Sequence, residues 1–200
     1  MKKKIKSSID FFKNYTKILN KTLRIINYKK IENICNIIEE KIINNCQIFV
    51  AGNGGSAAVA NHLLCDFNKG IKNSSNHKLL PKIISLSNSL ELITAISNDI
   101  NYTKIFSHQL ENYANEQDCI ILFSCSGSSK NVLEAIKVAK EKNIKIIFIT
   151  GFSNTKISGV DIHLNLNCKN YGITEDIFSS IMHMISQKIR AKYSYKNEIL

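Results

Sequence analysis

Ile48-Phe49-Val50-Ala51-Gly52-Asn53-Gly54-Gly55-Ser56 is the stretch that decides the fold of this 200-residue chain. Its first half is a continuous apolar run, which is typical of a short buried strand, and the glycines behind it predict a tight loop that leads into a helix. Glycine lets the backbone bring N–H groups close to a ligand, and a helix N-terminus favours an anion. Asn53 and Ser56 add side-chain donors at the same place. The unit predicts a phosphate site, and the alternative is a tight turn that binds no ligand.

A second loop of this kind follows the apolar run from Cys119 to Phe123. Ser124-Cys125-Ser126-Gly127-Ser128-Ser129 leads into a helical pattern over about residues 130–142. Hydroxyl and backbone donors at a helix start suit a phosphate ester, while the alternative is that Ser128 or Ser129 only caps the helix. The patterns G-x-G-x-x-G and G-x-x-x-x-G-K-[ST] are absent, so the sequence indicates neither a dinucleotide nor a nucleoside triphosphate.

The remaining pattern predicts one α/β domain. Apolar segments alternate with helical patterns, which favours a parallel sheet covered by helices on both faces, with ligands at the carboxyl ends of the strands. We expect residues 1–45 to form a pair of amphipathic helices that breaks near Asn27, and residues 46–200 to form the α/β core. Lys69 to Lys82 is expected to be a polar loop. The expected strands are 47–51, 82–87, 119–124, 144–150 and 161–166, and the expected core helices are 56–68, 88–97, 103–115, 129–142 and 173–194.

Charge and cysteine usage narrow the class of protein. The net charge of +11 favours an anionic partner, but the lysines are scattered rather than gathered into one stripe with aromatic residues, so no nucleic acid is expected. The six cysteines form no C-x-x-C pair, which suggests reduced, mostly buried thiols. No apolar run is long enough for a membrane span, and the segment from Ile5 to Asn14 is amphipathic rather than a secretory leader. We therefore expect a cytoplasmic protein without a membrane partner.

Four residues are candidates for proton transfer or metal binding. His62 and Asp66 are four residues apart, and Glu175 and His183 lie about two turns apart on the last helix. Each has an ordinary alternative: a surface hydrogen bond for the first pair, a favourable helix-start charge for Glu175, and a core histidine for His183.

The sequence resembles SIS (sugar isomerase) domains over nearly its whole length, and among them the phosphoheptose isomerases. The matching segments are Ala51 to Ser56, His62 with the acid four residues later, Ser97-Asn98-Asp99, Ser124 to Ser129, Ile149-Thr150-Gly151, and a final helix that contains His183. The resemblance implies a SIS-type parallel five-stranded sheet sandwiched by helices. It also implies a homotetramer with active sites at subunit interfaces, in which the N-terminal helices are used for oligomer packing. We expect Ile9, Phe12, Ile34 and Ile38 to be buried against partner subunits.

The resemblance further implies an aldose–ketose isomerase. Asp66 would be the catalytic base and His183 the acid in converting sedoheptulose 7-phosphate to a D-glycero-heptose 7-phosphate, through an enediol(ate), for lipopolysaccharide or capsule precursors. A zinc ion would be held by His62, Asp66, Glu175 and His183, a donor set that suits Zn²⁺. The implied substrate-binding residues are Asn53, Gly54, Gly55, Ser56, Asp99, Ser124, Cys125, Ser126, Ser129 and Glu175.

The chain departs from the family pattern at positions that bear on the substrate. Asp66 stands where glutamate is usual, Glu175 where an amide is usual, Ala57 where a histidine often follows the serine, and Gly172 where an acid is often found. Two alternatives therefore stay open. One is a non-catalytic SIS protein that binds a replication initiator or senses a sugar phosphate, and the other is an isomerase of a shorter sugar phosphate.

Overall fold

A five-stranded parallel sheet forms the centre of the computed structural model, which describes residues 7–153 and 157–195. The strands are β1 (Gln47–Ala51), β2 (Lys82–Ser85), β3 (Cys119–Ser124), β4 (Lys145–Thr150) and β5 (Ile162–Asn165), in the order β2-β1-β3-β4-β5. The winding direction reverses between β1 and β3, and a crevice opens at the carboxyl ends of the strands at such a point. Both glycine- and serine-rich loops follow these two strands. The predicted fold class is confirmed.

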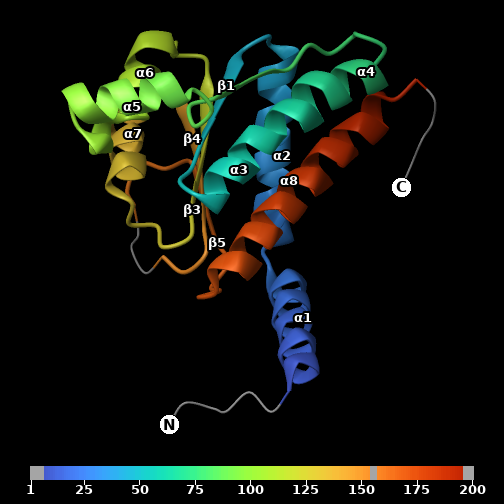
Figure 1. Ribbon diagram of the computed structural model, residues 1–200. Helices are drawn as coiled ribbons and strands as arrows, with labels where there is room; N and C mark the ends of the chain where they lie inside the picture. Colours follow the sequence, from blue (N-terminus) through green and yellow to red (C-terminus); the bar gives the residue numbers. More distant parts are fainter. Residues whose placement is uncertain (1–6, 154–156, 196–200) are drawn as a thin grey trace.

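Helices cover both faces of the sheet (Figure 1). The helices are α1 (Ser8–Ile25), α2 (Tyr28–Ile43), α3 (Gly55–Leu63), α4 (Lys72–Ser74), α5 (Leu90–Asp99), α6 (Ser107–Tyr113), α7 (Lys130–Glu141) and α8 (Tyr171–Tyr193). One core lies between the sheet and α2, α3 and α8, and a second lies between the sheet and α5, α6 and α7. Successive strand side chains point to opposite faces, so Ile48 and Val50 enter the first core while Phe49 and Ala51 enter the second.

The helix after β1 is longer than predicted and widens partway. It continues from α3 through a π-helical segment, Leu64–Ile71, into α4, so the expected polar loop does not begin at Lys69. The cause is burial: Ile71 is fully buried on this segment. The Asn68 side chain also binds β2, where its Oδ1 accepts from Ile83 N at 2.8 Å and its Nδ2 donates to Ile83 O at 2.9 Å. Asp66 lies in the first turn of the widened segment, and such segments are frequent at functional sites.

The two N-terminal helices differ in what covers them. Ile34 and Ile38 on α2 are fully buried in the first core, so the expectation that partner subunits bury them is wrong; their own chain does. Helix α1 projects from the body of the molecule (Figure 1), and Ile9 and Phe12 on it are 63% and 64% exposed. The apolar face of α1 is therefore only partly covered, chiefly by its contact with α8.

The cysteines are free thiols, and most are buried. Burial raises the pKa of Cys119 to about 12 and that of Cys125 to about 11, so both are protonated at neutral pH. In the part of the chain that the structure describes, no helix combines the length and the apolar content that crossing a bilayer requires.

The C-terminal part of α8 is held against α2 by the buried side chain of Glu39, which is 8% exposed. Lys192 Nζ and Tyr193 Oη both donate to Glu39 Oε1, and Lys188 Nζ lies 3.6 Å from Oε2. Burial alone would raise the pKa of Glu39, but the hydrogen bonds from Lys192 and Tyr193 and the lysine charges outweigh it and lower the pKa below its ordinary value.

Replacing Glu39 with glutamine is expected to lower the free energy of unfolding at neutral pH by about 1.5–3 kcal/mol, which is the contribution of hydrogen bonds to a charged group. Because the pKa of Glu39 is lower in the folded chain, this contribution is complete above the unfolded value and is lost as pH falls through the folded value. Urea unfolding from neutral pH to below ~4 measures it. Glu40→Gln is the matched control, since the Glu40 side chain is 58% exposed. A loss equal in both variants, or independent of pH, contradicts the prediction.

Candidate functional site

A cavity of about 360 Å³ lies where the loops after β1 and β3 meet the start of α8. It is lined by Asn53, Gly54, Gly55, Ser56, Phe123, Ser124, Cys125, Ser126, Ser129, Tyr171 and Glu175. The structure thus brings together nine of the ten residues expected to bind substrate, all but Asp99. Asp99 is the last residue of α5, is exposed, and accepts a hydrogen bond from Asn98 Nδ2 at 2.8 Å. Phe123 and Tyr171 were missed because nothing in their local sequence distinguishes them from core or surface aromatic residues.

Two helices begin at this cavity without a side-chain cap from any residue that the structure describes. Gly54 precedes α3 with φ +54°, a conformation that glycine adopts at little cost, and it has no side chain to cap the helix. Ser129 precedes α7, and within the described residues its hydroxyl makes no capping bond but lies 3.2 Å from Ser124 Oγ. The alternative that Ser129 only caps the helix is therefore wrong. A helix N-terminus that no N-cap side chain covers is a favourable place for an anion.

Asn53 is held in place by residues that the sequence analysis did not identify. Asn53 and Asn131 exchange two amide hydrogen bonds of 3.0 and 2.8 Å, and Tyr102 Oη donates to Asn53 Oδ1 at 3.1 Å. Asn131 is 2% exposed, at the position four residues before the buried Ala135 of α7. A polar residue on the apolar stripe of a helix was the signal that could have found it.

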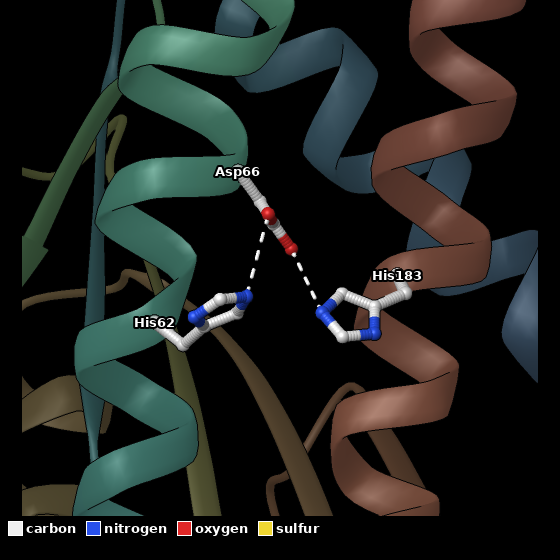
Figure 2. A group of neighbouring side chains, drawn as sticks. All are labelled: His62, Asp66 and His183. Carbon is white, nitrogen blue, oxygen red and sulfur yellow. Dashed lines mark ion pairs between the residues drawn. The ribbon is translucent and has the colours of Figure 1, made fainter.

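A second group lies further along the same two helices (Figure 2). Asp66 extends between two histidines: its Oδ1 is 3.5 Å from His62 Nε2 and its Oδ2 is 3.3 Å from His183 Nε2. The two imidazole rings are 5.1 Å apart and nearly perpendicular. His62 comes from α3, Asp66 from the π-helical segment and His183 from α8. The predicted base, Asp66, therefore lies beside the predicted acid, His183, and these two lie together with His62, the other predicted histidine ligand of a metal.

The group fits a metal ion. One ligand atom from each of the three residues lies within 4.8 Å of the others. Asp66 Oδ2 is buried and, apart from the 3.3 Å approach of His183 Nε2, which does not form a hydrogen bond, it has no partner among the described residues; a buried polar atom of this kind is costly unless something binds it. The histidine side chains are 53% and 44% exposed, so a ligand can reach the group from solvent. Two imidazoles and a carboxylate are donors that Zn²⁺ accepts.

Glu175, the fourth predicted ligand, is not in this group. Its carboxylate is in the cavity, where Ser56 Oγ donates to Oε1 at 3.4 Å and Cys125 Sγ lies at 3.7 Å. The reason is its position on α8, about 12 Å of helical rise before His183. Gly55 makes room for it, because a Cβ there would lie 2.1 Å from Glu175 Oε2.

A cavity lined by serine- and glycine-rich loops at the switch point of a parallel sheet, without a nucleotide fingerprint, points to the SIS (sugar isomerase) class of domains. Residues 10–151 match the SIS domain model. Together with the relatives described next, this shows that the chain belongs to the SIS domain family and, within it, to the phosphoheptose isomerases.

The relatives cover most of this chain. A protein of Thermoplasma acidophilum named "Probable phosphoheptose isomerase" is 36% identical over 169 residues, which are 84% of this chain and 91% of the relative. The phosphoheptose isomerase of Campylobacter concisus is 31% identical over 160 residues, 80% of this chain and 83% of the relative.

Solved structures share the fold. The phosphoheptose isomerase GmhA of Neisseria gonorrhoeae superposes with a TM-score of 0.78 at 24% identity, covering 90% of this chain and 95% of that chain. The Vibrio vulnificus NanR protein, complexed with ManNAc-6P, superposes with a TM-score of 0.65 at 15% identity, covering 94% of this chain and 64% of that chain. The same fold is therefore found in proteins with different names.

Replacing Ser126 and Ser129 together with alanine is expected to weaken phosphate binding. A hydrogen bond to a charged group contributes about 1.5–3 kcal/mol, so each lost bond should raise the dissociation constant by about tenfold or more. Titration calorimetry with inorganic phosphate measures it. Ser128→Ala is the matched control, since Ser128 is in the same loop but is exposed and does not line the cavity. An unchanged dissociation constant in the double variant would count against an anion in this cavity.

Proposed function

We propose that this protein is an aldose–ketose isomerase that interconverts sedoheptulose 7-phosphate and a D-glycero-heptose 7-phosphate, for lipopolysaccharide or capsule precursors. The observation that carries the proposal is the position of Asp66 between His62 and His183, on the helices that begin at the cavity lined by the two serine- and glycine-rich loops. The names of the relatives support it.

The separation of the two parts suits a phosphorylated sugar. The cavity is at the start of α3 and α8, and the Asp66 group lies about two helical turns further along both. An extended sugar can therefore place its phosphate at Ser56, Ser124, Ser126 and Ser129 while its carbonyl end reaches the histidines. Asn53 would contact the sugar between them. A contact from Asp99 stays a prediction.

The isomerisation moves one proton between adjacent carbons and another between their oxygens. Asp66, held between the two histidines, accepts the proton from the carbon next to the carbonyl. His183 donates a proton to the carbonyl oxygen, which forms the enediol(ate). Return of the Asp66 proton to the neighbouring carbon, with loss of the other hydroxyl proton to His183, completes the conversion.

A zinc ion is proposed at His62, Asp66 and His183, and a fourth ligand from Glu175 would require its carboxylate to leave the cavity. When bound, zinc would polarise the sugar carbonyl and stabilise negative charge on its oxygen.

Asp66→Asn and His183→Ala should each lower kcat by about 10²–10⁴, the usual contribution of a general acid or base. Asp66→Asn keeps the shape of the side chain but cannot accept the proton. Turnover of sedoheptulose 7-phosphate by folded variants is the measurement. His77→Asn is the control, since His77 is exposed and asparagine tolerates its φ of +63°. Full activity in a folded Asp66→Asn, His183→Ala double variant would show that these residues are not the active site.

The proposed zinc site gives a separate prediction about activity and metal content. A chelator should lower activity and added Zn²⁺ should restore it, and equilibrium dialysis should show less bound zinc in His62→Ala than in the unaltered protein. Indifference to the chelator, with no zinc bound at equilibrium, would leave the acid–base mechanism without a metal.

The two non-catalytic alternatives are compatible with the same fold, but they do not require the acid and the histidines. A sensor of sugar phosphates, or a non-catalytic protein that binds a replication initiator, needs only the cavity, whereas the grouped acid and histidines favour an enzyme. Turnover assays with ketose phosphates of five, six and seven carbons separate the substrate lengths. No turnover with any of them, together with capture of a replication initiator, would support the non-catalytic reading.

A cytoplasmic homotetramer with active sites at subunit interfaces is also proposed, since α1 presents Ile9, Phe12 and Ile25 to solvent. Sedimentation at micromolar concentration should give a tetramer, and Phe12→Glu should shift it to smaller species because a buried charge is costly. Lys17→Gln, on the polar face of α1, is the control. A monomeric unaltered protein contradicts the assembly.

A further inference from the structure

Glu175 is the residue that the proposed function leaves unexplained, because it brings a negative charge into a cavity that should bind a phosphate. Its carboxylate lies against Ser56 Oγ and Cys125 Sγ, and these residues line the cavity with Ser126 and Ser129. A phosphate group bound to the serine loops and this carboxylate would compete for the same donors. The two negative charges would also repel each other at such close range.

The carboxylate fits the cavity closely. Gly55 lies against it, and a Cβ at that position would be 2.1 Å from Oε2 and 2.5 Å from Cδ of Glu175. The φ of Gly55 is outside the left-handed region, so the backbone there does not require glycine. The absence of a side chain at Gly55 is instead what leaves space for the Glu175 carboxylate.

The surroundings that suit a phosphate also suit the carboxylate. Helix α3 begins at Gly55, where none of the described side chains caps it, and the hydroxyl of Ser56 donates to the carboxylate. A helix N-terminus favours any negative charge, whether it belongs to a ligand or to a side chain. Glu175 is half-buried, and Tyr171, which also lines the cavity, is 59% exposed. The cavity is therefore not closed over the carboxylate.

We propose that Glu175 is a built-in competing anion: its carboxylate occupies the phosphate cavity of the free protein, and the phosphate group of the substrate displaces it. This inference rests on the proposed function. It makes Glu175 a specificity-determining residue, because every anion must replace the carboxylate before it binds. A small anion that contacts only the serine loops binds poorly, whereas a sugar phosphate has further contacts along α3 and α8 that offset the displacement.

The test compares the unaltered full chain with Glu175→Gln and Asp176→Asn by titration calorimetry, using inorganic phosphate and sedoheptulose 7-phosphate as probes. Glutamine keeps the size of the side chain and removes its charge, so Glu175→Gln should bind inorganic phosphate about tenfold or more tightly. Asp176→Asn removes the same charge one residue later, where the side chain accepts from Tyr15 on α1 rather than entering the cavity. It should bind phosphate as the unaltered protein does. Glu175→Ala serves in place of Glu175→Gln if the latter does not fold.

The outcomes separate this inference from the proposed function. Equal or weaker phosphate binding by Glu175→Gln, with measurable binding by the unaltered protein, overturns the competing anion and leaves the phosphate cavity intact. An equal gain in Asp176→Asn also overturns it, because net charge alone then explains the effect. If neither probe binds to any variant, the cavity is not a phosphate site and the proposed function fails with it. A gain for inorganic phosphate that is larger than the gain for the sugar phosphate supports the specificity role.

Discussion

The packing of α8 along α3 is the constraint on which the site depends. Ile173, Ile177, Phe178 and Ile181 on α8 are fully buried in the core that this helix shares with α3, and the Phe178 ring lies 5.4 Å from that of Phe123 on β3. The two helices lie side by side in Figure 1 and begin at the same cavity. The two helices run alongside each other from this cavity, so Ser56 near the start of α3 lies against Glu175 in the first turns of α8, and His62 lies beside His183 further along. A slip of one turn, about 5.4 Å, would separate both pairs at once.

The parts of the fold and site that depend on local chemistry could be predicted from the sequence. The bounds of β1 and β3 agree with the predicted strands, because continuous apolar runs that stop at glycine or serine mark a buried parallel strand. The two loops were identified for the same reason. The spacing of His62 and Asp66 likewise indicates a shared helix face, although the structure shows that the helix widens between α3 and α4 and that Asp66 lies in the widened turn.

The parts that could not be predicted depend on how distant segments pack. Ile9 and Phe12 have the same helical periodicity as Ile34 and Ile38, yet the first pair is exposed and the second is in the core. Periodicity shows that a face is apolar and leaves open whether the same chain or another one covers it. The direction of the Glu175 side chain was equally hidden, since it follows from the register of α8 against Gly55. Asn131 on α7 was missed because its partner, Asn53, is on the loop after β1, far away in the sequence.

The bonds between Asn68 and Ile83 have a consequence for how the molecule behaves among its copies. Strand β2 is an edge of the sheet, and an edge presents unpaired N–H and C=O groups that can recruit a strand from another molecule. The Asn68 amide offers β2 one donor and one acceptor, much as a neighbouring strand would, and so occupies the groups of Ile83. At the opposite edge, the ammonium group of Lys30 binds the carbonyl of His163 on β5, and lysine at an edge discourages strand pairing. Each edge of this lysine-rich, isoleucine-rich protein thus carries a polar side chain that opposes sheet-to-sheet aggregation.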